Sequence, residues 1–344
     1  MGRDHRSVRC AARYVLTRLK VKALVAQELS GPSGLKYVDI EDVADGGGEN
    51  TVVVDVGAAG VSFPDLLLLR GEYQLKLEPP FIPGMEAAGV VVSAPYESEF
   101  KPGERVTALT MLGGWAERVA VPPANLRPTP DDLDDAEAVA LLGNYQTMYF
   151  ALAKRGALRA GETVLVLGSA GGVGTAAIQV AKALGATVIA MVHRPHGTEF
   201  VESLGADVVL PLTDGWLQAV KDYTGGRGVD LVVDPVGGEV FDDAIRALAT
   251  EGRLLVLGFA SGGGIPNVKV NRLLLRNVSV IGVGYGEYVN RTPGAQALFE
   301  FGVAELVRAG LRPPPPVRFP LANGAEALQS LADGGVLGKV VLEP

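Results

Sequence analysis

The segment TVLVLGSAGGVGTAAIQVAKALG at 163–185 constrains this chain more than any other. It begins with an apolar run of the kind found in central parallel strands, and it closes with a helical pattern that ends at a glycine. Between them, a glycine-rich loop lets the backbone approach a phosphate group, which the first amides of the helix can bind. The pattern predicts a nucleotide site formed by Gly168, Ser169, Gly171, Gly172, Val173 and Gly174. Ser169 replaces the first glycine of the usual G-x-G-x-x-G pattern.

Strands and helices alternate beyond this segment. Short apolar runs typical of strands follow successive helical stretches, at 187–192, 206–212, 230–237, 253–259 and 278–284. This order predicts a doubly wound parallel sheet of the Rossmann type.

The flanking parts of the chain have a different pattern. From residue 21 to about 130, valine-rich alternating runs are separated by Gly-Pro, Pro-Pro and Asp-Gly turn signals, which predicts a partly open β-barrel. Residues 131–156 then change to helical spacing with an acidic start. Towards the end, the pattern predicts helices at 294–309 and 324–332 and a final strand at 339–344.

The formal net charge of −8 is unevenly distributed. Residues 1–20 hold six basic side chains and one acidic one, a net of +5, which leaves −13 for the rest. An acidic body argues against a nucleic-acid partner. We expect the basic start to be an extension outside the fold. The alternative is a targeting arm, although the apolar stretch of a secretory signal is missing.

Few side chains in the chain can bind a metal. One cysteine, Cys10, and three histidines exclude a disulfide scaffold and a four-cysteine zinc site. A membrane span is also excluded, because the most apolar window, 163–192, is divided by its glycine loop and by Lys182. We therefore expect no membrane partner and a cytoplasmic location.

The residues after the second Rossmann strand indicate which nicotinamide cofactor is bound. An NAD enzyme places Asp or Glu about 20 residues beyond the glycine loop, where it holds the ribose hydroxyls. This chain has His193, Arg194, Pro195 and His196 there. Because a guanidinium can pair with a 2′-phosphate, Arg194 favours NADPH over NADH. The alternative is an exposed surface arginine.

Eight segments together resemble a known family. They are GVSFPDLLLLRGEYQ (60–74), PGMEAAGVV (83–91), NYQTMYFAL (144–152), LGSAGGVGTAAIQVAKALGA (167–186), DLVVDPVGG (230–238), GRLLVLGFASG (252–262), VNRLLLRN (270–277) and GKVVLEP (338–344). In this order they resemble the zinc-independent quinone oxidoreductases of the medium-chain dehydrogenase/reductase superfamily. The resemblance implies a GroES-like catalytic domain, at 21–145 and 286–344, and a Rossmann cofactor domain at 146–285.

The resemblance also accounts for the missing metal ligands. Zinc-dependent members of the superfamily carry a cysteine, a histidine and a second cysteine where this chain has Ser62, Met85 and Gly143. A hydroxyl, a thioether and a glycine cannot rebuild a catalytic zinc site. We expect no functional metal.

Further cofactor contacts are implied by position. Thr147 would lie near the nicotinamide ribose, and Lys339 near the pyrophosphate. The pyrophosphate would also face Gly171, Gly172 and Val173, and the other positions expected to border the cofactor are Gly237, Gly258, Phe259 and Asn271. Two residues depart from the family, since Ser62 replaces a frequent asparagine and Leu212 replaces a frequent tyrosine beside the adenine.

The chemistry expected without zinc is direct hydride transfer from the nicotinamide to an electron-poor carbon, which leaves the product in need of a proton. Tyr73 is the candidate donor, because it aligns with an active-site tyrosine of related enoyl-thioester reductases, and Ser62 is the second candidate catalytic residue. The alternative for Tyr73 is a core or cleft-lining aromatic. Tyr145 and Tyr149 are at helical spacing and are expected to pack in the core.

Three functions stay open at this point. The favoured one is an NADPH-dependent quinone oxidoreductase that acts on a small-molecule electron acceptor. A reductase of enoyl thioesters or other activated alkenes would share the fold and the cofactor, with only Arg70 and Lys76 nearby to hold carrier phosphates. A noncatalytic nucleotide-binding or structural protein is disfavoured by the intact glycine loop, Tyr73 and Arg194.

The apolar segment VSVIGVGYG at 278–286 predicts how the molecule associates. Its pattern predicts a strand at the edge of the parallel sheet, where an unpaired strand would promote aggregation. Because related proteins often join such edges across a two-fold axis, we expect a homodimer.

Overall fold

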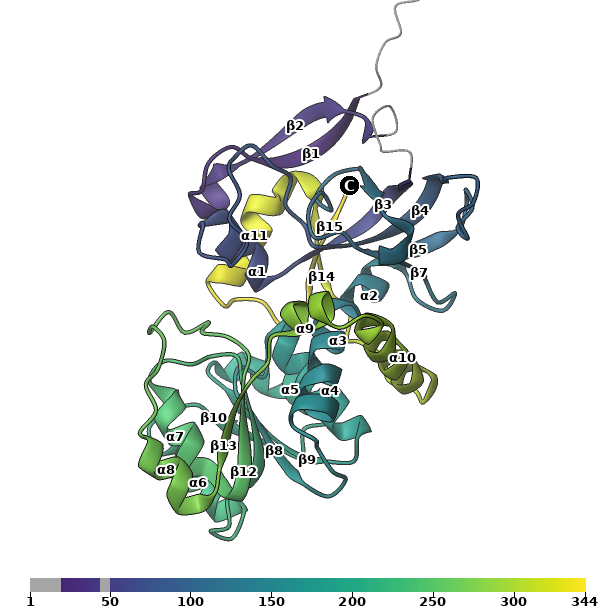
Figure 1. Ribbon diagram of the computed structural model, residues 1–344. Coiled ribbons are helices and arrows are strands. Elements are labelled where there is room, and N and C mark those ends of the chain that lie inside the picture. Colours follow the sequence, from purple (N-terminus) through teal and green to yellow (C-terminus); the bar gives the residue numbers. More distant parts are fainter. Residues whose placement is uncertain (1–19, 44–49) are drawn as a thin grey trace, which may run out of the picture.

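The computed structural model describes residues 20–43 and 50–344. The expected N-terminal extension therefore lies outside the described residues, apart from Lys20, which begins the first strand opposite Glu41. Figure 1 shows two parts, a parallel sheet flanked by helices and a barrel built from both ends of the chain. The predicted combination of a doubly wound sheet with a partly open β-barrel is confirmed.

The parallel sheet has the strand order β10-β9-β8-β11-β12-β13. Its strands are β8 (Thr163–Val166), β9 (Thr187–Val192), β10 (Val208–Pro211), β11 (Val229–Asp234), β12 (Leu248–Val256) and β13 (Ser279–Gly282). The order runs outward from β8 in one direction and from β11 in the other. The switch point, where ligands bind in such sheets, therefore lies between the carboxyl ends of these two strands.

Helices cover both faces of this sheet, which explains its nearly continuous apolar strands. They are α4 (Gly172–Ala183), α5 (Thr198–Ser203), α6 (Trp216–Tyr223), α7 (Val240–Ala247) and α8 (Val270–Arg276). Alternate residues of β8 face opposite sides: Val164 and Val166 pack in the cluster that includes α4, and Leu165 packs in the cluster that includes α6 and α7.

The barrel part consists of a seven-stranded sheet and a separate hairpin. The sheet has the order β14-β15-β3-β4-β5-β7, with β6 paired to β3. Its strands are β3 (Val52–Val61), β4 (Glu86–Ser93), β5 (Arg105–Leu109), β6 (Arg118–Val121), β7 (Leu126–Pro128), β14 (Val317–Pro320) and β15 (Val340–Glu343), and the hairpin is β1 (Lys20–Ala26) with β2 (Leu35–Glu41). Because β15 lies between β14 and β3, the end of the chain completes a sheet begun near its start.

The helical stretch predicted at 131–156 is interrupted. It forms α2 (Asp135–Ala140), α3 (Gly143–Tyr149) and a π-helical turn at Phe150–Arg155, with a break at Leu141 and Leu142. The acidic start behaves as predicted, since Asp134 caps α2 and accepts a hydrogen bond from the Glu137 amide at 2.8 Å.

Four more α-helices lie within the described ranges of the chain. They are α1 (Phe63–Leu69), α9 (Tyr285–Arg291), α10 (Ala295–Arg308) and α11 (Gly324–Ala332). Tyr145 is buried and Tyr149 packs closely against Gly302 of α10, which confirms that both tyrosines belong to the core. In the part of the chain that the structure describes, no helix combines the length and apolarity needed to cross a membrane.

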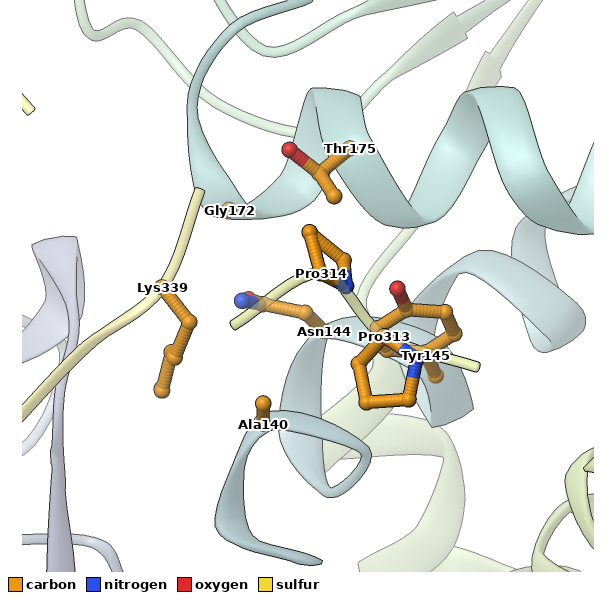
Figure 2. A pocket seen from close by; sticks show the side chains of 8 residues that line it. All are labelled: Ala140, Asn144, Tyr145, Gly172, Thr175, Pro313, Pro314 and Lys339. Atoms are coloured by element: carbon orange, nitrogen blue, oxygen red, sulfur yellow. The ribbon is translucent and has the colours of Figure 1, made fainter. Parts of the chain in front are cut away.

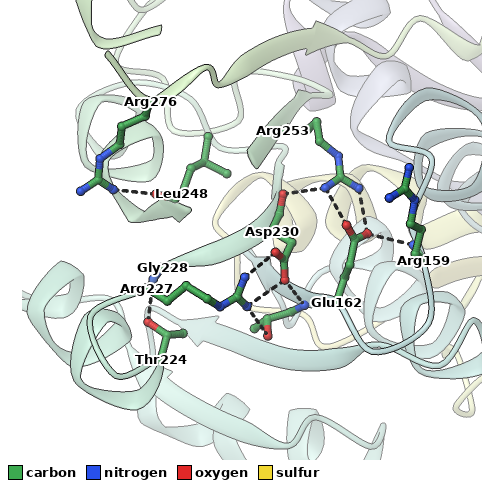
Figure 3. A network of polar contacts seen from close by, with 10 residues as sticks. Arg159, Glu162, Thr224, Arg227, Gly228, Asp230, Leu248, Arg253 and Arg276 are labelled. Carbon is green, nitrogen blue, oxygen red and sulfur yellow. Dashed lines mark hydrogen bonds and ion pairs between the residues drawn. The ribbon is translucent and has the colours of Figure 1, made fainter. Parts of the chain in front are cut away.

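A polar network fixes the amino-terminal edge of the parallel sheet (Figure 3). The Arg253 guanidinium donates to both carboxylate oxygens of Glu162, at 2.8 and 2.9 Å, and to the Gly156 carbonyl. Beside it, Arg227 pairs with Asp230, which also accepts from the Thr163 amide at 2.7 Å. These bonds lie at the end of the sheet opposite the glycine loop, so they position the strands and leave the other edge free for a ligand.

Candidate active site

The glycine loop leaves β8 and enters α4 as the sequence predicts. Gly168 has a φ of +61°, which favours glycine, and Gly171 caps α4 without a side-chain acceptor. Gly174 has no room for a side chain, because a Cβ there would lie 2.2 Å from the Gly168 carbonyl oxygen. The amides of the first helical turn, at Gly172, Val173 and Gly174, have no intrahelical acceptor and are suited to bind a phosphate.

Ser169 has a different role from the rest of the loop. Its side chain is fully buried. Its hydroxyl donates to the Val166 carbonyl at 2.8 Å and accepts from the Met191 amide at 2.9 Å. The hydroxyl therefore joins the ends of β8 and β9 and is not available to a ligand.

The C-terminal segment closes over the glycine loop. The Gly338 amide donates to the Ala170 carbonyl at 2.8 Å, and Gly338 forms a parallel bridge with Gly171. The next residue, Lys339, is buried and its Nζ lies 2.5 Å from Glu86 Oε2. Lys339 thus lies near the loop as implied, but its charge is paired with Glu86 of the barrel instead of being free for a pyrophosphate.

Two glycines make room for this buried ion pair. A Cβ on Gly60 would lie 2.4 Å from Glu86 Oε2, and one on Gly143 would lie 2.1 Å from Glu86 Oε1. The Gly143 amide also donates to Glu86 Oε1 at 3.0 Å. Glu86 therefore occupies the space that a side chain at position 143 would need. This glutamate lies in the segment 83–91 that carries part of the family resemblance, but no role is predicted for it from the sequence.

Ser62 is hydrogen-bonded to a buried acid that sequence analysis did not single out. Asp65 Oδ2 accepts from the Ser62 hydroxyl at 2.6 Å and from the Ser62 amide at 2.9 Å, in a capping box at the start of α1. Burial raises the pKa of Asp65 to about 6, against the opposing hydrogen bonds from Ser62 and the attraction of Lys339. The S/T-x-x-D spacing of a capping box was the available sequence signal.

Tyr73 lies near the same acid. Its side chain is half-buried, and burial together with the negative charge of Asp65 raises its pKa. Its hydroxyl therefore keeps its proton over the whole physiological range.

A cavity of about 10 Å³ lies where α3, α4 and the C-terminal segment meet (Figure 2). A cavity of this size is at the lower limit for holding one water molecule. Thr175 Oγ1 is buried and has no hydrogen-bond partner among the described residues. Asn144 reaches Gly172 so closely that a Cβ there would lie 2.5 Å from its Nδ2. The remaining lining residues are Ala140, Tyr145, Pro313, Pro314 and Lys339.

The loop after β11 holds a second set of implied cofactor positions. Asp234 is fully buried, and its Oδ1 accepts from the Val236 and Gly237 amides at 2.9 and 2.8 Å. These bonds fix Gly237 at a φ of +62°, where a Cβ would lie 2.8 Å from the Phe259 ring. Asp234 is thus a positioning residue that sequence analysis missed, while Gly258 and Phe259 follow β12 at the same edge.

Two other implied positions are separate from this loop. Thr147 is half-buried in α3, on the helix whose start touches the glycine loop. Asn271 is exposed in the first turn of α8.

Arg194 follows β9 and reaches across to the barrel part. Its guanidinium donates to the Asp333 carbonyl at 2.6 Å and to the Gly334 carbonyl at 2.9 Å, both just after α11. The side chain therefore stands at the edge where the sequence places it, but in this structure its donors connect the two parts of the molecule.

A larger cavity, of about 410 Å³, lies between α10, the α2–α3 segment and the barrel. Its lining is mainly aliphatic, with Leu133, Leu141 and Val303, and the Arg127–Glu300 ion pair stands beside them. None of the site residues expected from the sequence lines it.

Known proteins share both parts of this architecture. A family model described as alcohol dehydrogenase GroES-like domain matches residues 48–131, and one described as zinc-binding dehydrogenase matches residues 172–300. Quinone oxidoreductase-like protein 2 of Bos taurus is 38% identical over 270 residues, which cover 78% of this chain and 76% of that protein.

Two crystal structures extend the comparison. A probable oxidoreductase from Mycobacterium abscessus is 60% identical and has a TM-score of 0.87, covering 95% of this chain and 100% of its own. The quinone oxidoreductase from Thermus thermophilus, whose complex with NADPH is also known, is 37% identical and has a TM-score of 0.78, covering 94% of this chain and 100% of its own.

Proposed function

Because this chain belongs to the quinone oxidoreductase group of the medium-chain dehydrogenase/reductase superfamily, we propose that it reduces a quinone or another electron-poor acceptor with NADPH and without zinc. Its membership of this superfamily identifies the protein as an oxidoreductase. The observation that carries the proposal is the glycine loop, whose first-turn amides have no acceptor within the helix and which contacts the Gly338–Lys339 segment of the barrel. A cofactor bound by those amides lies at the junction of the two parts.

Support for NADPH comes from three residues and one relative. Gly172 and Gly174 lie in a loop whose first-turn amides can bind a phosphate, and neither position has room for a Cβ beside its neighbours in the protein. Arg194 stands at the edge that would hold the adenosine ribose. Residues 193–196 contain no Asp or Glu that could accept a hydrogen bond from the ribose hydroxyls. The Thermus thermophilus relative, of 37% identity, binds the same cofactor. When bound, NADPH supplies the hydride, and the residues of this chain orient the acceptor and supply the proton.

Support for a zinc-free reaction comes from the donor set. Ser62, Met85 and Gly143 stand where zinc relatives have their ligands, and Glu86 fills the space beside Gly143 while paired with Lys339. Within residues 20–43 and 50–344, no three His, Cys, Asp or Glu side chains cluster in a way that would hold a metal. The residues present do not fit a catalytic zinc ion.

The proposal is tested with NADPH and a small panel of acceptors. We expect turnover with 1,4-benzoquinone and much slower turnover with crotonyl-CoA. The reverse order would favour an enoyl-thioester reductase, and no turnover with either would contradict an NADPH-dependent reductase. We also expect chelation to leave the rate unchanged. One zinc per chain whose removal abolishes activity would contradict the zinc-free mechanism.

We further propose that a second copy of the chain is the protein partner. β13 is the edge strand of the parallel sheet, so one side of it has no neighbour among the described strands. Beside it in sequence, α8 exposes Val270, Leu274 and Leu275, which are 68%, 76% and 77% accessible. Pairing of two β13 edges would cover an unpaired strand next to apolar side chains.

A further inference from the structure

Asp65 is a buried carboxyl group that is only partly satisfied. Its side chain is fully buried. Oδ2 accepts two hydrogen bonds from Ser62, but Oδ1 has no partner among the described residues. A buried oxygen without a donor is costly for a carboxylate and less so for a neutral acid.

The strand register brings the Ser62–Asp65 pair to the cofactor side of the barrel. Val61 of β3 is paired with Val340 of β15 in an antiparallel ladder, so Ser62 lies opposite Lys339. The residue before Lys339 is Gly338, whose amide donates to the Ala170 carbonyl of the glycine loop. Ser62 is only partly buried, whereas Asp65 lies behind it.

The ionisable groups around Asp65 come from three other segments. Lys339 of the C-terminal segment attracts a negative charge there, and Glu86 of β4 opposes it. Tyr73, which follows α1, faces the same carboxyl group. With desolvation as the largest effect, the pKa of Asp65 rises to about 6, so the acid can hold and release a proton near neutral pH.

We propose that Ser62 and Asp65 form a two-residue relay for the proton of the reduction. Ser62 Oγ donates to the acceptor oxygen that gains negative charge. When Asp65 is protonated, the hydrogen bond between the two side chains is reversed, so that Asp65 Oδ2 carries the proton and donates it to Ser62 Oγ. The relay rests on the proposed reductase function and assigns Asp65 a role in it. Ser62 is then the group that touches the acceptor, and Asp65 acts through it.

With a quinone as the acceptor, the relay supplies one proton for each hydride that the acceptor gains. A ring carbon conjugated to a carbonyl gains the hydride supplied by NADPH and forms a C–H bond, the ring double bond shifts towards the carbonyl carbon, and the π pair of that carbonyl becomes a lone pair on its oxygen. That oxygen takes the hydroxyl proton of Ser62, while the O–H bond of Asp65 breaks and its proton moves to Ser62. Asp65 is left as a carboxylate that accepts from the Ser62 amide and is stabilised by Lys339, until water returns the proton.

The relay is tested with Asp65→Asn and Ser62→Ala, assayed with NADPH and 1,4-benzoquinone. Each substitution should lower kcat about 10- to 100-fold, within the range of general acid catalysis. The double variant should be no slower than either single variant, because both act in one chain. Ser62→Thr keeps a hydroxyl and should retain most of the activity.

The pH profile separates a relay from a structural role. Wild-type kcat should fall above about pH 6, as Asp65 loses its proton, whereas Asp65→Asn and Ser62→Ala should lack this limb. Glu137→Gln is the matched control, since Glu137 is the N3 residue of the α2 capping box as Asp65 is of the α1 box. It should leave both kcat and the pH profile unchanged.

A readout without cofactor addresses the acid directly. The infrared spectrum of the wild type should lose a protonated-carboxyl band between about pH 5 and pH 8, and Asp65→Asn should lack that band. If Asp65→Asn does not fold, the kcat values and pH profiles of Ser62→Ala and Ser62→Thr test the relay instead.

The experiments distinguish failure of the proposed reductase function from failure of the relay. A wild type that reduces none of the acceptors would overturn the proposed function and the relay with it. An active wild type whose Asp65→Asn and Ser62→Ala variants keep its kcat and pH profile would overturn the relay alone.

Discussion

Arg194 illustrates how the surroundings of one residue qualify its predicted role. Its guanidinium is charged and stands beyond β9, as a residue that selects NADPH should. In the structure it donates to the Asp333 and Gly334 carbonyls, so a 2′-phosphate must replace those two acceptors. A phosphate is the stronger partner because it is charged.

Arg194→Ala should therefore raise the KM for NADPH and leave the KM for NADH nearly unchanged. A charge-assisted hydrogen bond contributes about 1.5–3 kcal/mol, which corresponds to roughly a 10- to 150-fold change in discrimination. Steady-state kinetics with both cofactors measure it. Equal use of the two cofactors by the wild type, or an alanine variant with unchanged discrimination, would show that Arg194 only links the two parts of the protein.

Asp65 makes stability depend on pH. Its pKa is about 6 in the folded protein, against 3.8 for an unperturbed group, so the folded state binds more protons between these values. Stability should therefore fall by about 3 kcal/mol in all as pH rises from about 3 to about 7, and then level off. Asp65→Asn should remove this fall. Urea midpoints measured over that pH range test this prediction. If the midpoint of the Asp65→Asn variant depended on pH as strongly as that of the wild type, Asp65 would not be the group responsible.

At the scale of elements, the α2–α3 break has a physical cause. The Gly143 amide begins α3 by donating to Glu86 of the barrel, while Asp134 starts α2 separately with its own cap. The two helices therefore start from two separate anchors, one local and one in the barrel. Hydrophobic periodicity alone predicts helical spacing across 131–156 and carries no information about a break that depends on a side chain 57 residues earlier.

Gly143→Ala should therefore be strongly destabilising for a helical position. Its Cβ would meet Glu86 Oε1 and displace that carboxylate from Lys339, which would leave a buried charge less well paired. We expect a loss of about 1–3 kcal/mol. Gly286→Ala in α9 is the control, because nothing lies within 4 Å of the added Cβ, and it should be neutral or slightly stabilising. Equal melting temperatures of the two variants would contradict the steric argument.

At the scale of the whole molecule, the exposed face of α8 is the feature best explained by a partner. Leu275→Glu places a charge on that face and should convert the proposed dimer to a monomer at micromolar concentration, as measured by light scattering. Leu298→Glu in α10 is the matched control, because Leu298 is also exposed, at 60%. A monomeric wild type, or a Leu275→Glu variant that remains dimeric, would contradict association through this face.

The sequence by itself determined the order of elements and the glycine loop. Fully apolar strands, helix-ending glycines and the positions of Gly168 and Gly174 are local requirements, set by backbone conformation and by which surfaces are covered. The absence of zinc ligands at Ser62, Met85 and Gly143 could also be read from residue types, through the family resemblance.

Only the tertiary structure decided which charges meet. Glu86 and Lys339 are 253 residues apart, and they pair because β15 inserts beside β3 while Gly60 and Gly143 leave the space. The same register places Ser62, which is bonded to Asp65, opposite Lys339. Local propensity extends over a few residues, whereas burial and Coulomb interactions depend on distance in space. The protonation of Asp65 and the pairing of Lys339 are therefore properties of the folded chain.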